Sequence, residues 1–333
     1  MILVTGGTGL VGSHLLYYLC KQHDTVVAIH RKGSNQEAVR RVFSYYGDNT
    51  SLYEKIQWKE ADITDVVSLA DAFKGITHVY HCAALVSFDS ADDAQMELTN
   101  IEGTANIVNL SITNKVKKIC YVSSIATVGK SIQGKLIDEN SEWNIEHSNY
   151  GYAITKHGAE MELWRASQEG VNVVIVNPGV ILGSGFWHNG SGKLVTSVHK
   201  GLKFYIEGIT GFVGVEDVVK IMILLMESHI INERYILISE NTSFKNVLFT
   251  IADLLDKKRP NIKITKTMSA IFWRIEWFLK LFGRTPLLTK QSASSAHNTY
   301  YFSNEKVKKE LNYEFRPIKK VLEKICDDFK KDH

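Results

Sequence analysis

Short apolar runs alternate with longer stretches of helical periodicity along the first 180 residues of the chain. Runs such as VVAI and VVIV are apolar at successive positions, as parallel strands need when both faces of their sheet are covered. Strands are predicted at six runs rich in β-branched residues: 2–5, 25–30, 55–58, 76–81, 118–123 and 171–177. Helices are predicted near 10–21, 34–46, 65–73, 93–113 and 150–169. This alternation predicts an α/β fold, a doubly wound parallel sheet with right-handed crossovers.

The pattern changes after Pro178, where residues 183–192 (GSGFWHNGSG) are rich in glycine and predict a loop. Further helical or extended segments are predicted at 214–228, 234–238, 243–256, 268–283 and 303–331. The first two of these are expected to return to the sheet. We therefore expect a nucleotide-binding domain from residues 1–180 plus about 212–240. Residues of about 181–211 plus 241–333 are expected to form a smaller α/β substrate lobe over the carboxyl ends of the strands.

The segment MSAIFWRIEWFLKLF, residues 268–282, is unusually aromatic. One interpretation is a core or lid helix with an apolar face. The other is a helix at a membrane surface, or a wall for an apolar substrate. Arg274, Glu276 and Lys280 interrupt the segment, which argues against a membrane span.

Composition and charge exclude several classes of protein. The 333 residues allow about two domains of ~150 residues each. Usage of 44% hydrophobic and 23% charged residues is ordinary for globular proteins, which excludes a disordered chain, collagen and a coiled coil. A net charge of +3 is too balanced to favour a nucleic-acid partner.

The cysteines and histidines carry no metal or disulfide pattern. Cys20, Cys82, Cys120 and Cys326 form no C-x-x-C pair, so we expect buried thiols in a reducing compartment. The 12 histidines show no H-E-x-x-H spacing, and no metal is expected. No signal peptide and no uncharged run of ~20 residues is visible, so we expect a cytoplasmic protein without a membrane span.

A glycine-rich turn follows the first predicted strand and opens the first helix. Gly6, Gly9 and Gly12 are spaced G-x-x-G-x-x-G. The first glycine permits a sharp turn, the second a close approach of a pyrophosphate, and the third close packing of helix and sheet. The free N–H groups of the helix start, which include Leu10 and Val11, favour phosphate. The alternative is a tight β–α connection without a ligand.

The end of the second predicted strand indicates which dinucleotide is bound. An acidic residue there would bind the ribose of NAD, but the chain has His30, Arg31 and Lys32 instead. Because an arginine fork suits a 2′-phosphate, we predict NADP, with NAD as the alternative if these charges are only solvated. Asp62 and Ile63 follow the third strand and are expected at the adenine edge, unless Asp62 caps the next helix.

Three side chains are candidates for catalysis. Tyr152 and Lys156 are four residues apart and share one face of a predicted helix. A nearby Lys⁺ favours phenolate and is expected to lower the Tyr152 pKa, so that the phenol exchanges a proton with a substrate oxygen. Ser124 lies at the carboxyl end of the fifth predicted strand, where it can hydrogen-bond a substrate carbonyl. Its neighbour Ser123 is better interpreted as a turn residue.

These motifs, in this order, resemble those of the extended short-chain dehydrogenases/reductases, which combine T-G-x-x-G-x-x-G, a strand-end serine and Tyr-x-x-x-Lys. The first motif matches Thr5–Gly12, and the others match Ser124 and Tyr152–Lys156. Softer matches occur at His81–Ala84, Asn100–Thr104, Asn177–Gly179 and Phe212–Val218. The resemblance spans nearly the whole chain and weakens after about residue 240.

The resemblance implies a Rossmann domain with a nicotinamide cofactor. Tyr152 would be the acid/base, Lys156 its partner and a ribose ligand, and Ser124 the carbonyl anchor. The remaining residues expected near the cofactor are Ala83, Ala84, Ser123 and Pro178, while Asn100 is expected to support the sheet or a water. Members often form homodimers through the helices that correspond to 93–113 and 150–169.

The family contains reductases, sugar epimerases and sugar dehydratases. A dehydratase is disfavoured because Ile125 and Ala126 stand where an Asp-Glu pair follows the strand-end hydroxyl. Many epimerases carry Arg-Asp before F-x-x-V-x-D, whereas this chain has residues 209–211 (ITG) there. The sequence resembles the dihydroflavonol-reductase-like and steroid-dehydrogenase-like branch. We therefore predict reduction of a carbonyl on a small, moderately apolar substrate.

Two other functions remain open. The first is a nucleotide-sugar epimerase with tightly bound NAD, whose diphosphate would need another cation, for which Arg274, Arg284 and Arg316 are candidates. The second is a non-catalytic dinucleotide sensor, although such relatives typically lose the tyrosine that this chain keeps.

Overall fold

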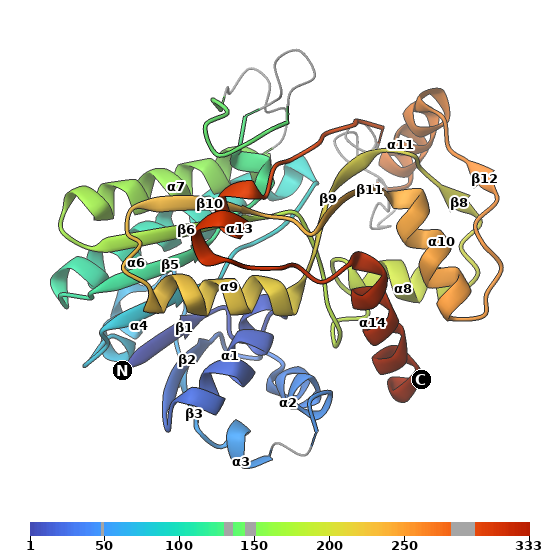
Figure 1. Ribbon diagram of the computed structural model, residues 1–333. Helices are drawn as coiled ribbons and strands as arrows, with labels where there is room; N and C mark the ends of the chain where they lie inside the picture. The colour runs from blue at the N-terminus through green and yellow to red at the C-terminus, as the bar shows by residue number, and fades with distance from the viewer. Residues whose placement is uncertain (48–49, 130–135, 144–150, 281–296) are drawn as a thin grey trace.

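The central sheet has seven strands, and every pairing within it is parallel. The computed structural model describes residues 1–47, 50–129, 136–143, 151–280 and 297–333. The sheet order is β10-β6-β5-β4-β1-β2-β3 (Figure 1). Its strands are β1 (Ile2–Thr5), β2 (Val26–His30), β3 (Ile56–Glu60), β4 (His78–His81), β5 (Lys118–Val122), β6 (Asn172–Pro178) and β10 (Glu233–Leu237). The chain leaves β1 toward β2 and β4 toward β5, so a crevice is expected at the carboxyl ends of β1 and β4.

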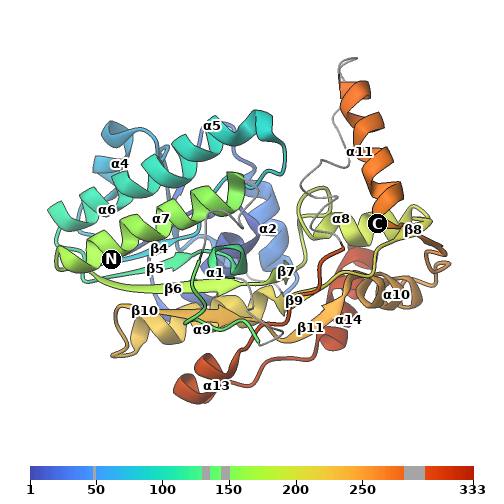
Figure 2. The same cartoon turned by 90° about the horizontal axis from the view of Figure 1, so that it is seen from above.

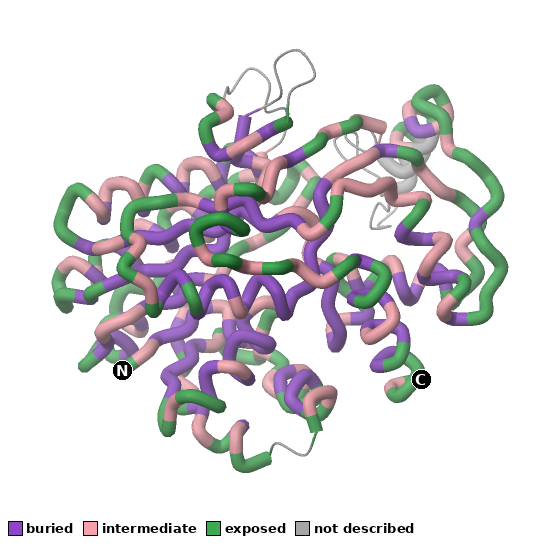
Figure 3. Tube along the Cα trace, in the orientation of Figure 1, coloured by how far each residue is buried: buried purple, intermediate pink, exposed green. Residues whose placement is uncertain are grey.

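Helices cover both faces of this sheet (Figure 2). One face is packed against α1 (Leu10–Gln22), α2 (Gln36–Ser44) and α9 (Val215–Glu227). The other is packed against α4 (Val66–Ala72), α6 (Gly103–Thr113) and α7 (Gly151–Gln168). Apart from the edge strand β3, the strands between them are buried along most of their length (Figure 3). The predicted doubly wound parallel sheet is therefore confirmed, and burial on both faces explains why its strands read as continuous apolar runs.

The helix predicted over residues 93–113 consists of three segments. They are α5 (Asp93–Met96), a π-helical stretch η2 (Glu97–Glu102) and α6. Stretches of π-helix often occur at functional sites. Here η2 carries Asn100, whose side chain is buried and whose contacts are described below.

A second group of elements, called the second lobe below, lies beyond the carboxyl ends of the main sheet (Figure 1). Its core is a three-stranded sheet of β7 (Val180–Leu182), β9 (Ile209–Gly214) and β11 (Glu240–Ser243). It packs against α8 (Gly192–His199), α10 (Phe244–Leu254) and α14 (Ile318–Asp332). The remaining elements are the short helices α3 (Thr50–Tyr53), η1 (Ser90–Asp92), η3 (Ile125–Thr127) and α13 (Glu305–Leu311), the strand pair β8 (Phe204–Tyr205) and β12 (Ile262–Lys263), and α11 (Lys266–Lys280).

The aromatic segment forms α11, which stands out from the second lobe (Figure 2). Ser269 is buried and hydrogen-bonds His297 at 2.7 Å, while Ile271 is 53% exposed. In this turn of α11, one side is therefore buried and the other is exposed to solvent. The helix is not part of the hydrophobic core. Residues 281–283 of the predicted helix lie outside the described residues. Within the described part of the chain, no helix has the length and apolar character that crossing a membrane requires.

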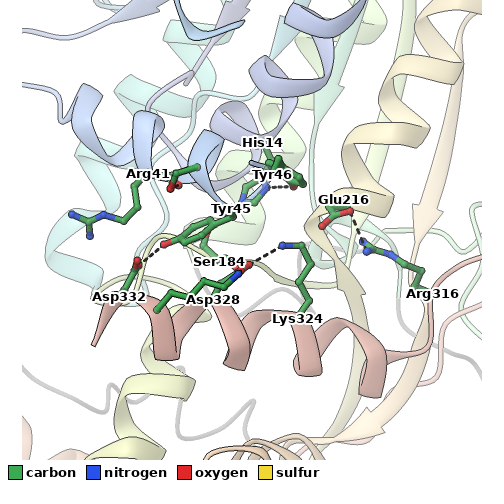
Figure 4. A network of polar contacts seen from close by, with 12 residues as sticks. His14, Arg41, Tyr45, Tyr46, Ser184, Glu216, Arg316, Lys324, Asp328 and Asp332 are labelled. Atoms are coloured by element: carbon green, nitrogen blue, oxygen red, sulfur yellow. Dashed lines mark hydrogen bonds and ion pairs between the residues drawn. The ribbon is translucent and has the colours of Figure 1, made fainter. Parts of the chain in front are cut away.

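Polar contacts join α14 to both lobes (Figure 4). The Tyr45 hydroxyl, just after α2, donates to Asp332 near the end of α14. Lys324 pairs with Asp328 at 2.8 Å, and Asp328 also accepts from the Ser184 hydroxyl at 2.9 Å. Because Ser184 follows β7, these bonds fix the loop after that strand against α14.

Candidate active site

The glycine-rich turn packs against its surroundings at two of the three glycines of the motif. Gly6 has a φ of +65°, and a Cβ there would lie 2.6 Å from the backbone nitrogen of Ala83. A Cβ on Gly12 would lie 2.2 Å from the carbonyl oxygen of Gly6. By contrast, a Cβ on Gly9 would meet only the Gly6 oxygen, at 3.3 Å, and Gly9 is exposed. The structure therefore leaves open space beside the middle glycine alone.

This open space lies at the start of α1. Gly9 is the N-cap residue and provides no side-chain cap. The N–H groups of the first turn, at Leu10, Val11 and Gly12, have no acceptor within the helix. Free N–H groups and the positive end of the helix dipole suit a diphosphate. The residues present therefore fit the pyrophosphate of a dinucleotide, as the sequence predicts.

The carboxyl end of β2 presents two cations. Arg31 and Lys32 are exposed, and neither forms an ion pair with any residue in the described ranges. The ring of His30 bonds the Arg31 carbonyl at 3.1 Å and meets Trp58 edge-on. Glu60 of β3 lies opposite His30 in the strand register. The two cations are therefore available to a ligand, although a carboxylate lies on the neighbouring strand.

Asp62 and Ile63 lie between β3 and α4. One Asp62 oxygen, Oδ1, accepts from the backbone N–H and the hydroxyl of Thr64, at 2.9 and 2.8 Å. The cap of α4 is Asp65, which accepts from Val67 at 3.1 Å. The alternative role proposed for Asp62, capping this helix, is therefore wrong: Asp62 closes the preceding turn.

Ser124, Tyr152 and Lys156 meet where β5 ends against α7. The side chain of Ser124 lies close enough to the Tyr152 hydroxyl to influence its pKa. Lys156 is 1% exposed, donates to the Val122 carbonyl at 2.6 Å, and lies 4.2 Å from the ring centroid of Tyr121. The structure thus gathers two hydroxyls and one ammonium group at the carboxyl end of the sheet.

Burial shifts the pKa values of this group in opposite directions. Burial lowers the pKa of Lys156 to about 7, against the opposing influence of Glu160 and Cys82. Burial raises the pKa of Tyr152 to about 12, and the nearby side chain of Ser124 offsets part of this rise. The predicted lowering of the Tyr152 pKa is therefore wrong, because burial of the phenol raises its pKa instead. A phenol that keeps its proton near neutral pH is suited to donate it.

The two neighbouring serines differ in their surroundings. Ser124 is partly exposed and caps η3, its hydroxyl accepting from the N–H of Ala126 at 3.1 Å. Ser123 is 4% exposed, and its backbone N–H donates to the Val176 carbonyl at 2.8 Å. Of the two, Ser124 alone presents its side chain toward the group described above. Pro178, also expected near the cofactor, ends β6 and is buried.

The loop after β4 is fixed by residues on both sides of the crevice. Asn100 accepts from the Leu85 N–H at 2.8 Å, and it donates to the Leu85 carbonyl at 2.9 Å and to the Thr155 hydroxyl at 3.1 Å. Ala83 donates its N–H to the Thr5 hydroxyl at 3.2 Å, and Ala84 follows it, exposed. Asn100 thus links this loop to α7.

Phe88, an aromatic neighbour of Tyr152, was not predicted from the sequence. The rings of Phe88 and Tyr152 lie 6.3 Å apart, and Phe88 is 41% exposed. Val86, in the same loop, is 59% exposed. Apolar side chains exposed beside a reactive phenol suit an apolar substrate. The only available sequence signal was their position shortly after a strand of a parallel sheet.

Comparison with protein families agrees with this geometry. The model of the NAD dependent epimerase/dehydratase family matches residues 2–237. Sterol demethylase protein B of Methylococcus capsulatus is 27% identical over 266 residues, which is 79% of this chain and 76% of that protein. A provisionally named dihydroflavonol 4-reductase of Synechocystis sp. is 26% identical over 328 residues, covering 96% and 91% of the two chains. The crystal structure of gox2253 has a TM-score of 0.83 and 26% identity, covering 100% and 98%.

Proposed function

The chain belongs to the NAD dependent epimerase/dehydratase family of extended short-chain dehydrogenases/reductases, and we propose that it reduces a carbonyl on a small, moderately apolar substrate with NADPH. The observation that carries this proposal is that Tyr152 and Ser124 lie together beside the buried Lys156 at the carboxyl end of β5. This arrangement pairs a proton donor with a second hydroxyl for one substrate oxygen.

The dinucleotide would be held along the crevice at the carboxyl ends of β1, β2 and β4. The diphosphate would lie beside Gly9 on the first-turn N–H groups of α1. Arg31 and Lys32 would bind the 2′-phosphate, which is why we propose NADP in preference to NAD. Asp62 and Ile63 would lie at the adenine, and Ala83, Ala84, Ser123 and Pro178 toward the nicotinamide. When bound, the reduced nicotinamide supplies a hydride to the carbonyl carbon.

Three side chains would donate the proton and stabilise the charge that develops on the substrate oxygen and on the phenol. Ser124 would donate a hydrogen bond to the substrate oxygen and polarise the carbonyl. Tyr152 would give its proton to the same oxygen as the carbon is reduced, so the product is an alcohol. The positive charge of Lys156 would then stabilise the phenolate that remains. The high pKa of Tyr152, about 12, supports its role as the acid in this direction.

Two observations favour a reductase over a nucleotide-sugar epimerase. Arg316, one candidate to bind a sugar diphosphate, already pairs with Glu216 at 3.1 Å and Asp217 at 3.4 Å. Arg284, a second candidate, lies outside the described residues, and Arg274 is exposed on α11. The exposed Phe88 and Val86 also suit an apolar substrate better than a sugar. The similarity to relatives named for a sterol and a dihydroflavonol supports the same choice.

The deciding experiment starts with purified protein to which nothing has been added. The protein is denatured, any released nicotinamide nucleotide is identified, and fresh protein is titrated with NADPH and NADH by fluorescence. NADPH oxidation is then followed with aromatic and alicyclic ketones, using Tyr152→Phe as the control. Tighter binding of NADPH and turnover that needs Tyr152 are expected. Stoichiometric NAD that survives purification would instead favour the epimerase, and binding without any turnover a sensor.

We also propose a homodimer through η2 and α7. Three apolar side chains on these neighbouring elements are exposed, namely Leu98 at 39%, Ile154 at 37% and Met161 at 44%. A second copy would cover them. Sedimentation equilibrium of the purified protein tests this proposal, and a monomer at micromolar concentration would contradict it.

A further inference from the structure

A fully buried carboxylate lies one helical turn beyond Lys156 on α7. Glu160 is 0% exposed, and its Oε1 accepts from the Thr127 hydroxyl at 2.6 Å and from the Asn177 amide at 2.7 Å. Its Oε2 has no hydrogen-bond partner and lies 3.8 Å from Nη1 of Arg234. A buried ion with one unsatisfied oxygen costs folding free energy. Its presence there indicates a role other than stability.

The two residues that donate to Glu160 also lie against Ser124, although the single hydroxyl proton of Thr127 serves one acceptor at a time. The Thr127 hydroxyl lies 2.8 Å from the Ser124 carbonyl oxygen, and the Asn177 amide lies 3.2 Å from the same oxygen. The N–H of Thr127 donates to this oxygen as well, at 3.1 Å, which closes η3. Asn177 lies on β6 and Thr127 follows β5. Glu160 therefore ties α7, β6 and the turn that begins at Ser124 into one network.

The same carboxylate supplies negative charge near Lys156. Residues four apart on a helix share a face, so Glu160 and Lys156 are neighbours on α7. The other titratable groups around the ammonium are Cys82 and His81 at the end of β4, Tyr121 of β5 and Tyr152 of α7. Burial lowers the pKa of His81 to about 3, so its ring is neutral. Of the groups acting on Lys156, Glu160 is the carboxylate, and it opposes the effect of burial on the Lys156 pKa.

Arg234 and His157 face Glu160 from a third side. Arg234 extends from β10, where two of its guanidinium nitrogens also donate to the Glu139 carbonyl. His157 lies on α7 with its ring stacked on Trp143 at 3.8 Å between centroids, and burial lowers its pKa. The guanidinium of Arg234 partly balances the charge of Glu160.

We propose that Glu160 is a positioning residue for the reaction proposed above. It holds the turn of Ser124 through Thr127 and Asn177, and its negative charge keeps the neighbouring Lys156 in the ammonium form. Glu160 touches neither substrate nor cofactor in this proposal; it acts through the two residues that do. The proposal rests on the assigned roles of Ser124 and Lys156, so its test uses measurements that need no turnover.

The charge effect is measured by NMR on protein labelled with 13Cε-lysine. The Lys156 signal is identified by its absence from Lys156→Met, and its titration is followed with pH. Glu160→Gln keeps the volume and the oxygen that accepts from Thr127 and Asn177, but it removes the charge. Its Lys156 midpoint is expected to fall by about one pH unit or more. The control Glu162→Gln removes a carboxylate that pairs with Arg165 at 2.7 Å on the same helix, and it should leave the midpoint unchanged. An unchanged Lys156 midpoint in Glu160→Gln would overturn the proposal that the charge of Glu160 acts on Lys156.

The link to Ser124 is tested with Thr127→Val, which keeps the shape of the side chain and the charge of Glu160. Amide hydrogen exchange over residues 124–128 should become at least tenfold faster, while the Lys156 midpoint stays in place. Thr127→Ser should restore slow exchange. Unchanged exchange in Thr127→Val would overturn the proposal, and this variant decides alone if Glu160→Gln does not fold. Failure of the proposed function would instead appear as absent NADPH oxidation in the unaltered protein.

Discussion

Replacing two glycines of the same turn by alanine should give opposite results. A methyl group on Gly12 would lie 2.2 Å from the Gly6 oxygen and 2.7 Å from the Gly6 carbonyl carbon, and both atoms belong to the backbone. Such overpacking costs about 3 kcal/mol, near the upper end of measured values. At roughly 2–4 °C per kcal/mol, Gly12→Ala should lower the Tm by about 6–12 °C.

Gly9→Ala should leave the fold intact and weaken nucleotide binding. Gly9 has a φ of −96° and a ψ of 176°, which alanine adopts without strain. Its new methyl would approach only one atom, at 3.3 Å, so the change in stability should stay within about 0.5 kcal/mol. The methyl would occupy the space assigned to the diphosphate. NADPH affinity should therefore fall at least tenfold, about 1.4 kcal/mol.

The assay for both variants is a thermal melt without nucleotide, followed by fluorescence titration with NADPH. The reasoning about the turn is refuted if Gly12→Ala melts with the unaltered protein. The placement of the diphosphate is refuted if Gly9→Ala binds NADPH as tightly as the unaltered protein does. Because the two substitutions add the same methyl group within one turn, each serves as the control for the other.

Three further predictions concern the charged and catalytic groups. Tyr152→Phe should reduce turnover by about 10²–10⁴-fold in steady-state assays while NADPH affinity stays the same, and equal loss of both would contradict an acid/base role. The double variant Arg31→Ala, Lys32→Ala should bind NADPH at least tenfold more weakly and NADH unchanged, as measured by fluorescence titration; parallel losses would exclude a 2′-phosphate site. Lys156→Met should be more stable than the unaltered protein at pH 6, because burial lowers the lysine pKa from 10.5 to about 7. Between those two pKa values the unfolded chain binds more protons than the folded protein does. The burial of Lys156 therefore destabilises the fold less as the pH rises, and the Tm difference between Lys156→Met and the unaltered protein should shrink above pH 7.

The main sheet was predictable because burial on both faces leaves a local signal in the sequence. The predicted strand 118–123 is one residue longer than β5, and 171–177 is shifted by one residue from β6. The small sheet of the second lobe was not predicted. Its strand β7 has three residues and β11 has the sequence ENTS, which carries no apolar alternation. Such strands form because neighbouring segments pair with them, a tertiary effect that local patterns do not encode.

The candidate site shows the same division. Gly9, Ser124 and Tyr152 stand in motifs with fixed spacing, so they were identified from the sequence. Glu160 stood in a helical pattern as an ordinary charged residue, and its burial shows only once β5, β6 and α7 are packed together. The predicted direction of the Tyr152 pKa shift was wrong for a related reason. Spacing reveals the neighbouring lysine, whereas the loss of solvent depends on the whole fold.

The path of the chain between its two sheets has a consequence for folding and engineering. After β6 the chain enters the second lobe, returns through α9 and β10, and leaves again at β11. Strand β10 pairs with β6 across more than fifty residues of intervening sequence. A fragment that stops near residue 180 would therefore lack α9 and leave part of one sheet face uncovered. We expect the lobes to unfold in one cooperative transition, and a graft of the second lobe onto a related enzyme would need several crossover points rather than one.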